Sequence, residues 1–384
     1  MSFNEVYATI NQKKVHDTID SFTAAQIKQA LFKRGKLTVD DFLALISPAA
    51  APFLEEMANR SHNTTLKRFG RTIALYAPIY LSSECANSCL YCGFNKDAPI
   101  PRVTLSEEEI HAEAQSLKNK GFDNILLVTG ESPGKVNIDY LERAVTLLRQ
   151  YFSFVSIEVQ PLEKNEYLRL IRAGVDGVTS YQETYHQERY RHYHPKGKKA
   201  RMEYRLETAD RAASATIRQM GLGVLLGLSD WRVDSYMVAA HLDYLKKRYW
   251  RTRWSVSVPR LRPAGGAEQV EFPVSDRELV QLICAYRIWD ENLGIVLSTR
   301  ESPQFRNHTV PLGITMMSAG SCTEPGGYSL KKESGGQFDV FDARPPAEVA
   351  FMIRQSGYEP VWKDWDSAFH GELKKTLYPE SKVG

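Results

Sequence analysis

Three of the five cysteines lie within eight residues, in the stretch SECANSCLYCGF. Cys85, Cys89 and Cys92 form a C-x3-C-x2-C pattern. Three thiolates at this spacing can each bind one iron of a [4Fe-4S] cube, which leaves the fourth iron without a protein ligand. An iron that is open in this way can bind a cofactor. The spacing therefore predicts an iron–sulfur centre with one exchangeable position.

The same three thiols have a second interpretation as part of a structural zinc site. Structural zinc usually takes four ligands from two short clusters, and no second C-x2-C pair occurs in the 384 residues. Five cysteines are also too few for a disulfide scaffold in a chain of this length. We therefore favour the iron–sulfur centre and keep a zinc-stabilised barrel hydrolase as the alternative.

The cysteines directly follow an apolar stretch that is typical of a buried β-strand. From residue 71 to residue 320, strand-like segments alternate with amphipathic helical ones. Strands rich in Val, Ile and Leu that are separated by helices pair in parallel through right-handed crossovers. Eight such units predict an α/β fold, a closed (β/α)8 TIM-type barrel, with a doubly wound open sheet as the runner-up. The predicted strands are Ile73–Leu81, Asn124–Gly130, Phe154–Gln160, Gly177–Glu183, Gly221–Leu228, Trp254–Arg260, Gly294–Arg300 and Ile314–Gly320.

Two further segments flank the predicted barrel of residues 71–320. Residues 1–70 are expected to form an N-terminal helical cap, in which Thr38 and Asp41 have the spacing of a capping box. Residues 321–384 are rich in paired glycines and prolines, which predicts a loop-rich C-terminal extension.

Acidic residues stand at the ends of three predicted strands. Gly130 and Glu131 follow the second strand, Glu158 lies near the end of the third, and Glu183 ends the fourth. The carboxyl ends of barrel strands form the face on which barrel enzymes carry their chemistry. Carboxylates there can bind ribose hydroxyls or a cationic amine. We therefore expect these three acids at the mouth of the barrel.

Arginines and small polar residues follow the later strands. Arg260 and Arg262 come at the end of the sixth predicted strand, and Arg300 ends the seventh. A guanidinium fork holds a carboxylate through two parallel charge-assisted hydrogen bonds. These arginines are therefore candidates for binding a substrate carboxylate, with Arg300 the first choice, and Ser318 and Ser321 after the eighth strand are candidates to assist.

The charge balance excludes several classes of protein. Lys and Arg number 49 against 46 Asp and Glu, a net charge of +3, which does not fit a nucleic-acid binder that works through bulk positive charge. The basic stretch 189–201, with His192 and His194, is accordingly predicted to be a solvated loop. The longest apolar stretch, Gly221–Leu228, is too short to span a bilayer, and the first residues lack the apolar core of a secretory signal. We expect no nucleic acid, no membrane span and a cytoplasmic location.

Tyr91 stands directly before the third cysteine, and this arrangement is the signature of the radical S-adenosylmethionine enzymes, which the chain resembles over the predicted barrel. The resemblance implies that the open iron chelates the amino and carboxylate groups of S-adenosylmethionine. It implies that one electron from the reduced cluster then cleaves this cofactor to methionine and a 5′-deoxyadenosyl radical. It also implies that the pair Gly130 and Glu131 holds the cofactor's ammonium group, with Tyr91, Glu158 and Glu183 as further expected cofactor contacts.

Several strings narrow the resemblance to the aromatic amino acid lyases of this superfamily. YQETYH, VPRLRPAGG, STRES, SAGSCTEPGGYS and PVWKDWD are similar to those of the tyrosine lyases of bacterial thiazole biosynthesis. The resemblance implies cleavage of the Cα–Cβ bond of L-tyrosine to 2-iminoacetate (dehydroglycine) and 4-cresol, with Arg300 positioning the substrate for reaction. The implied partners are a thiazole synthase and a flavodoxin- or ferredoxin-type electron donor.

Related enzymes of the superfamily are the alternatives. They act on tyrosine or tryptophan in hydrogenase maturation, deazaflavin synthesis or indolic acid synthesis. The hydrogenase lyases carry a C-terminal cysteine motif for a second cluster. Here the later cysteines, Cys284 and Cys322, are isolated, so no second Cys-bound cluster is expected.

Overall fold

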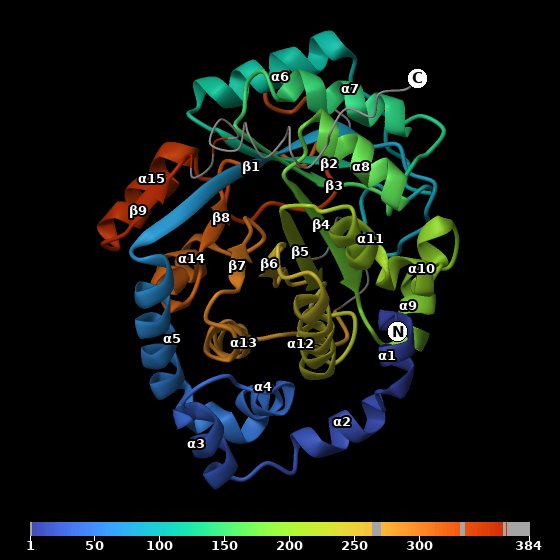
Figure 1. Ribbon diagram of the computed structural model, residues 1–384. Coiled ribbons are helices and arrows are strands. Elements are labelled where there is room, and N and C mark those ends of the chain that lie inside the picture. The colour runs from blue at the N-terminus through green and yellow to red at the C-terminus, as the bar shows by residue number, and fades with distance from the viewer. Residues whose placement is uncertain (1, 263–269, 331–334, 364–365, 367–384) are drawn as a thin grey trace, which may run out of the picture.

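Eight parallel strands form a closed barrel in the computed structural model of this chain (Figure 1). Residues 2–262, 270–330, 335–363 and 366 are described. The barrel strands are β1 (Thr72–Ser82), β2 (Asn124–Thr129), β3 (Phe154–Glu158), β4 (Gly177–Glu183), β5 (Gln219–Val224), β6 (Arg253–Ser257), β7 (Gly294–Leu297) and β8 (Met316–Ser318). Neighbours pair in the order β2 to β8 and then β1, and β1 also pairs with β2, which closes the ring. The predicted (β/α)8 barrel is therefore confirmed, and the open sheet was the wrong alternative.

The first strand is long enough to join both of its neighbours. Its lower part pairs with β8, with Ala74 opposite Met316, and its upper part pairs with β2, with Ala77 opposite Ile125. The upper part ends at Ser82, immediately before the cysteine motif. The ring closure therefore places the cysteines at the carboxyl end of the barrel.

A ninth strand, β9 (Glu359–Val361), lies at the other end of the barrel. It pairs in parallel with the first residues of β1, Thr72–Ala74. Trp362 follows it and packs edge-on against Phe122, with ring centroids 5.2 Å apart. The predicted loop-rich extension thus returns to the amino end of the barrel, while residues 367–384 and parts of the strings VPRLRPAGG and PVWKDWD lie outside the described residues.

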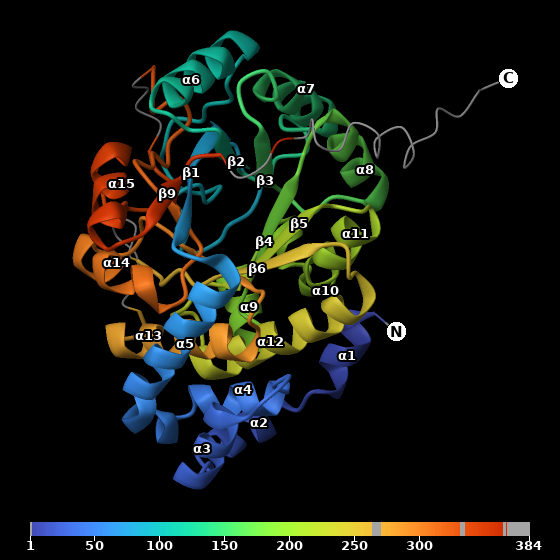
Figure 2. The same cartoon turned by 60° about the vertical axis from the view of Figure 1, so that its left-hand side comes forward.

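Helices surround the barrel, and the first four lie beyond one side of it (Figures 1 and 2). Thr38 and Asp41 form the predicted capping box at the start of α4. Phe42 of α4 is fully buried and lies 4.8 Å from the ring of Tyr286 in α13, so the N-terminal helices share one apolar core with the barrel.

No helix in the described part of the chain is long and apolar enough to cross a membrane. The helices are α1 (Phe3–Thr9), α2 (Gln12–Ile19), α3 (Ala24–Phe32), α4 (Val39–Ile46), η1 (Pro48–Phe53), α5 (Leu54–Phe69), α6 (Glu107–Asn119), α7 (Ile138–Leu148), α8 (Lys164–Ala173), α9 (Gln187–Tyr193), η2 (Lys198–Ala200), α10 (Met202–Leu206), α11 (Thr208–Ser214), α12 (Trp231–Arg248), α13 (Asp276–Trp289), α14 (Pro303–Thr309), η3 (Val310–Leu312) and α15 (Pro346–Gln355).

Candidate active site

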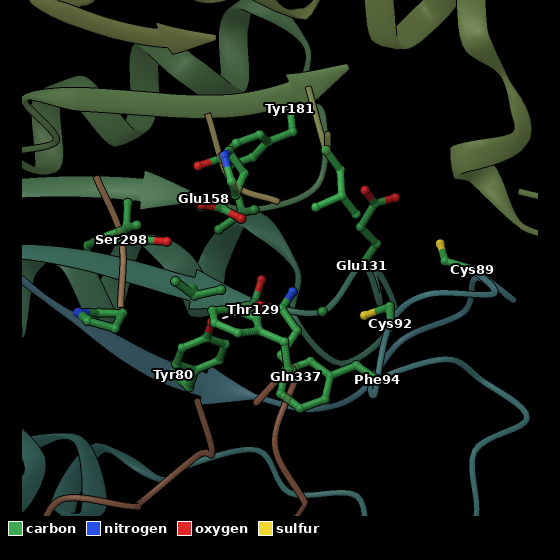
Figure 3. Close-up of a pocket in the computed structure, with 18 of the residues that line it drawn as sticks. Tyr80, Cys89, Cys92, Phe94, Thr129, Glu131, Glu158, Tyr181, Ser298 and Gln337 are labelled. Atoms are coloured by element: carbon green, nitrogen blue, oxygen red, sulfur yellow. Dashed lines mark hydrogen bonds between the residues drawn. The ribbon is translucent and has the colours of Figure 1, made fainter. Parts of the chain in front are cut away.

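A pocket lies at the carboxyl ends of the barrel strands, with an empty volume of about 1180 Å³ that is partly open to solvent. In Figure 3, Glu158 and Tyr181 point into the pocket, and the loop with Cys89 and Cys92 borders it. The predicted arginines Arg260 and Arg262 lie outside the lining, which includes Cys85, Cys89, Tyr91, Cys92, Gly130, Glu131, Glu158, Glu183, Arg300, Ser318 and Ser321.

The cysteine loop is held in place by backbone hydrogen bonds to two distant segments. The N–H of Ala86 donates to the carbonyl of Glu131 over 2.9 Å, and the N–H of Gly93 donates to the carbonyl of Gln337 over 3.0 Å. A Cβ atom on Gly93 would lie only 2.2 Å from the carbonyl oxygen of Gly336. Glycine at this position therefore lets the loop close against the C-terminal extension.

The three cysteines fit an iron–sulfur cluster. Burial raises the pKa of the Cys89 thiol to about 12 and that of the Cys92 thiol to about 11. A positively charged group beside them would therefore be needed to keep these thiols deprotonated. Within the described residues, no three His, Cys, Asp or Glu side chains converge enough to hold one metal ion. A cluster differs from a single zinc ion because each thiolate binds a separate iron atom. Three thiols that face one pocket without meeting at one point suit that geometry.

Four charged side chains form a buried network beside the cysteine loop. Nζ of Lys199 donates to Oε1 of Glu183 over 2.7 Å, and Nη1 of Arg205 donates to Oε1 of Glu131 over 2.9 Å. Each of these side chains is at most 12% exposed. Although burial acts to raise the pKa of Glu183, Lys199 and Arg205 hold it below its ordinary value. Two cations thus neutralise two carboxylates where unpaired charge would be costly.

Glu183 has an unusual backbone conformation. Its φ of 71° lies in the left-handed region, which is uncommon for residues other than glycine. The register of β4 against β5 shifts between Tyr181 and Glu183. Irregularities of this kind re-aim side chains and are found often beside functional sites. The irregular strand end brings the Glu183 carboxylate to Lys199.

Glu158 and Arg300 are the charged pocket residues that remain open to a ligand. Neither side chain has a hydrogen bond or ion pair with another residue in the part of the chain that the structure describes. Burial, with Glu183 nearby, raises the pKa of Glu158 to about 7. The guanidinium carbon of Arg300 lies 3.4 Å from the ring centroid of Phe338. Stacking of this kind fixes the plane of the guanidinium and leaves its edge free for a carboxylate.

Two buried hydroxyl groups in the pocket lack a protein partner among the described residues. They are Oγ1 of Thr129 and Oγ of Ser321. Buried polar atoms are normally hydrogen-bonded, so both oxygens are suited to a polar ligand. Ser318 differs, because its Oγ already accepts a hydrogen bond from the N–H of Thr299 over 3.0 Å.

The stretch 189–201 differs from the predicted solvated loop. Tyr190, Tyr193 and His194 are buried, and only part of the stretch, including His192, is exposed. The hydroxyl of Tyr91 lies 2.8 Å from Nε2 of His194. The prediction failed because it considered the charges and overlooked the aromatic residues that pack this segment against the cysteine loop.

Arg260 is placed differently from its prediction as a substrate ligand. Its Nε lies 3.1 Å from both carboxylate oxygens of Glu301, and its Nη1 donates to the carbonyl of Val274 over 3.0 Å and pairs with Asp276. Arg262 pairs with Glu301 as well. Glu301 therefore engages Arg260 and Arg262, and of the three predicted arginines Arg300 is the one that lines the pocket.

Several pocket residues were missed by the reasoning from sequence. Lys199 and Arg205 lie in helical segments between strands, where no motif marks them. Gln337 and Phe338 come from the extension. Asn87, inside the cysteine motif, carried the one available signal, and its Nδ2 donates to Oε2 of Glu131 over 2.8 Å.

Comparison with known proteins agrees with this geometry. Residues 79–238 match the model of the Radical SAM superfamily, and residues 257–359 match that of the Biotin and Thiamin Synthesis associated domain. The chain is 47% identical over 367 residues to 2-iminoacetate synthase of Escherichia coli (strain K12), covering 95% of this chain and 97% of that protein. The corresponding Salmonella typhimurium enzyme is 46% identical over the same length and coverage.

A solved structure shows the same architecture. The FeFe-hydrogenase maturase HydG from Carboxydothermus hydrogenoformans superposes with a TM-score of 0.85 at 29% identity, covering 97% of this chain and 87% of that chain. The barrel, with its three-cysteine loop after β1, is that of a radical S-adenosylmethionine enzyme. This finding replaces the alternative interpretation of the chain as a zinc-stabilised hydrolase. Within this class, the chain belongs to the 2-iminoacetate synthase family, and it is a lyase.

Proposed function

We propose that this enzyme cleaves the Cα–Cβ bond of L-tyrosine to 2-iminoacetate and 4-cresol, for the thiazole moiety of thiamine. The observation that carries the proposal is that one pocket joins the cysteine loop to an unpaired carboxylate, Glu158, and an unpaired guanidinium, Arg300. The guanidinium is complementary to the carboxylate of an amino acid substrate, and the Glu158 carboxylate to a hydroxyl or ammonium group of the bound cofactor. The family supports the same reaction, because the relatives it includes are 2-iminoacetate synthases.

Cys85, Cys89 and Cys92 would hold a [4Fe-4S] cluster, and S-adenosylmethionine would bind beside it. When bound, these groups supply the one-electron chemistry that removes a hydrogen atom from the substrate. Glu131 already accepts hydrogen bonds from Asn87 and Arg205. A carboxylate has about four acceptor positions, so Glu131 keeps capacity for the ammonium group of the cofactor.

The remaining proposed cofactor contacts are Tyr91, Gly130, Glu158 and Glu183. A Cβ atom on Gly130 would lie 2.3 Å from the carbonyl oxygen of Glu84. The absent side chain therefore lets the end of β2 approach the cysteine loop, leaving its backbone exposed to the pocket. Glu183, fixed by Lys199, would present its second oxygen to a hydroxyl of the cofactor.

Arg300 would bind the substrate carboxylate and thereby fix the position of the amino group. Its stacking on Phe338 restricts the guanidinium before the substrate arrives, which lowers the entropy lost on binding. Ser321 is positioned to donate a hydrogen bond to the same carboxylate, since its hydroxyl has no other partner among the described residues. Arg260 has no direct part in this proposal. Its guanidinium is engaged by the buried carboxylate of Glu301.

The proposed cofactors imply two protein partners and a location. A reduced cluster needs a low-potential electron donor, of flavodoxin or ferredoxin type. The imine product is unstable in water, which favours transfer to a thiazole synthase in a complex. A thiolate-bound cluster is suited to the reducing cytoplasm, where we place the enzyme.

The test is product analysis with reconstituted enzyme. The cluster is rebuilt anaerobically and reduced, and S-adenosylmethionine is added with tyrosine or, separately, with tryptophan. We expect 5′-deoxyadenosine and 4-cresol with tyrosine and no cleavage products with tryptophan. Deoxyadenosine without 4-cresol would retain the enzyme class and refute the substrate.

A further inference from the structure

A small exposed surface lies directly over the cysteine loop. Leu90, between Cys89 and Cys92, is a large apolar side chain with 44% of its surface exposed. Lys96, Lys196 and Lys198 are exposed close to it in the chain fold. We call these four residues the cluster-loop surface.

Backbone contacts bring the two segments of this surface together. The N–H of Leu90 donates to the carbonyl of Tyr193 over 3.2 Å, and the N–H of Ser88 donates to the carbonyl of Lys196 over 3.2 Å. On the other side, the N–H of Lys96 donates to the carbonyl of Asn87 over 2.8 Å. The lysines therefore surround the loop that carries Leu90.

The three lysines are available to a partner. None of them forms an ion pair with any residue in the described ranges. The acids nearby are engaged, since Glu84 pairs with Lys135 and Asp97 accepts a hydrogen bond from Ser88. Four lysines, Lys135 included, thus face two carboxylates, and the surface is positively charged.

We propose that the cluster-loop surface docks an acidic protein that carries a single electron at low potential. This inference rests on the proposed function, which requires reduction of a cluster held by Cys85, Cys89 and Cys92. In the step, the carrier loses one electron and the [4Fe-4S] cluster gains it, passing from the 2+ to the 1+ state. No proton crosses the interface when the carrier is a ferredoxin.

Position and charge both support this partner. Leu90 directly follows Cys89 and stands two residues before Cys92, so a protein seated on it lies at the start of a short through-bond path to two of the three thiolates. The lysines provide complementary charge for an acidic surface, which accelerates association and orients the partner. An apolar contact with a charged rim is the ordinary composition of a short-lived protein interface.

The experiment compares two reductants on the reconstituted enzyme. A plant-type [2Fe-2S] ferredoxin, reduced by one electron, is the protein donor, and dithionite is the small donor. In the variant K96E/K196E/K198E we expect the Kd for oxidised ferredoxin, measured calorimetrically, to rise about tenfold or more. The rate of cluster reduction by ferredoxin, followed by absorbance, should fall about as much, and dithionite-driven deoxyadenosine formation should stay within about twofold of wild type.

A matched control changes three cations at the opposite end of the barrel. Lys67 lies in the last turn of α5, which leads into β1, Lys247 lies in the last turn of α12, and Arg251 lies in the short link from α12 to β6. The variant K67E/K247E/R251E therefore alters the net charge equally at the amino face. We expect wild-type affinity for ferredoxin in this control. A second variant, Leu90→Asp, tests the apolar contact without altering the lysines.

The outcomes separate the two proposals. Wild-type affinity and reduction rate in K96E/K196E/K198E, or an equal loss in the control, would overturn the docking surface. A wild-type enzyme that forms no deoxyadenosine with either reductant would overturn the proposed function and the docking proposal with it. Deoxyadenosine without 4-cresol would refute the substrate alone, and the ferredoxin measurements would still decide the docking site.

Discussion

The Tyr91 hydroxyl donates a hydrogen bond to the neutral ring of His194. Nδ1 of His194 lies 2.7 Å from the carbonyl oxygen of Tyr190, which can only accept, so Nδ1 carries the hydrogen. Nε2 is then an acceptor, 2.8 Å from the Tyr91 oxygen. Burial lowers the pKa of His194 to about 3, which keeps the ring neutral. The histidine therefore fixes the aromatic residue that stands between Cys89 and Cys92.

This relationship predicts coupling between the two side chains. His194→Phe should destabilise the protein by about 1–3 kcal/mol, because it leaves a buried hydroxyl without an acceptor. Tyr91→Phe should have an effect of similar size, and the double variant should lose less than the sum. Anaerobic urea unfolding of wild type, the two single variants and the double variant measures these losses of stability. Strict additivity would contradict the proposed hydrogen bond.

Buried histidines also predict acid sensitivity. Burial lowers the pKa of both His194 and His241 to about 3, below the value of about 6.5 in an unfolded chain. The unfolded state therefore binds more protons, and stability is lost as the pH falls from about 6.5 towards 3, by about 1.4 kcal/mol per pH unit for each group. Unfolding free energies at pH 7 and pH 5 should show a smaller drop in His241→Gln than in wild type. An unchanged drop would mean that His241 ionises inside the fold.

Arg300 should govern substrate affinity. Loss of charge-assisted hydrogen bonds of about 1.5–3 kcal/mol each predicts that Arg300→Ala lowers kcat/KM for tyrosine at least about tenfold. Arg300→Lys should recover only part of this, since lysine keeps the charge without the fork. The KM for S-adenosylmethionine serves as the internal control. If that constant alone changes, Arg300 binds the cofactor.

Arg260 should behave as a structural residue. Arg260→Ala leaves the buried Glu301 carboxylate with one partner fewer, which predicts a loss of about 3–5 kcal/mol in stability. Arg260→Met combined with Glu301→Leu should recover much of it, because both charges of the buried Arg260–Glu301 pair are then removed. Thermal unfolding and the KM for tyrosine together show whether Arg260 stabilises the fold or binds the substrate. A folded double variant with a greatly raised KM would restore Arg260 as a substrate ligand.

Cysteine substitutions test the cluster directly. Cys89→Ala should lose most of the bound iron and the broad absorbance of an iron–sulfur cluster after reconstitution. Cys284→Ala is the matched control, since Cys284 is buried in α13 away from the pocket. Iron content and visible spectra measure how much cluster each variant holds. Full cluster content in Cys89→Ala would refute the ligand assignment.

The sequence predicted the barrel because a strand is marked by its own residues. All eight predicted strands overlap observed ones, and Gly177–Glu183 has the observed bounds. The residues at which the strands end were less predictable. The seventh strand stops at Leu297, three residues before the predicted Arg300, because pairing with a neighbour decides where a strand ends.

The site was predictable only where a local motif marks it. The cysteine spacing and the strand-end position of Glu158 and Arg300 are visible in the chain. Lys199 cannot be recognised in this way. Its place in the pocket depends on the ion pair with Glu183, whose carboxylate reaches it through an irregular strand end. Gln337 likewise depends on the path of the extension. Partners supplied by tertiary structure carry no signal in a single sequence.

The short strand β9 makes the whole segment from Ser318 to Glu359 a closed loop, tied to the barrel at both ends through β1. Within it, Gln337 accepts a hydrogen bond from the Tyr80 hydroxyl over 2.7 Å, and Phe338 supports Arg300. Because a segment held at both ends loses less conformational entropy on ordering than one held at a single end, the pairing of β9 with β1 helps to order the pocket wall from the opposite end of the barrel. Removing the chain from Glu359 onward would thus loosen the pocket at the carboxyl ends of the strands without altering a single residue that lines it.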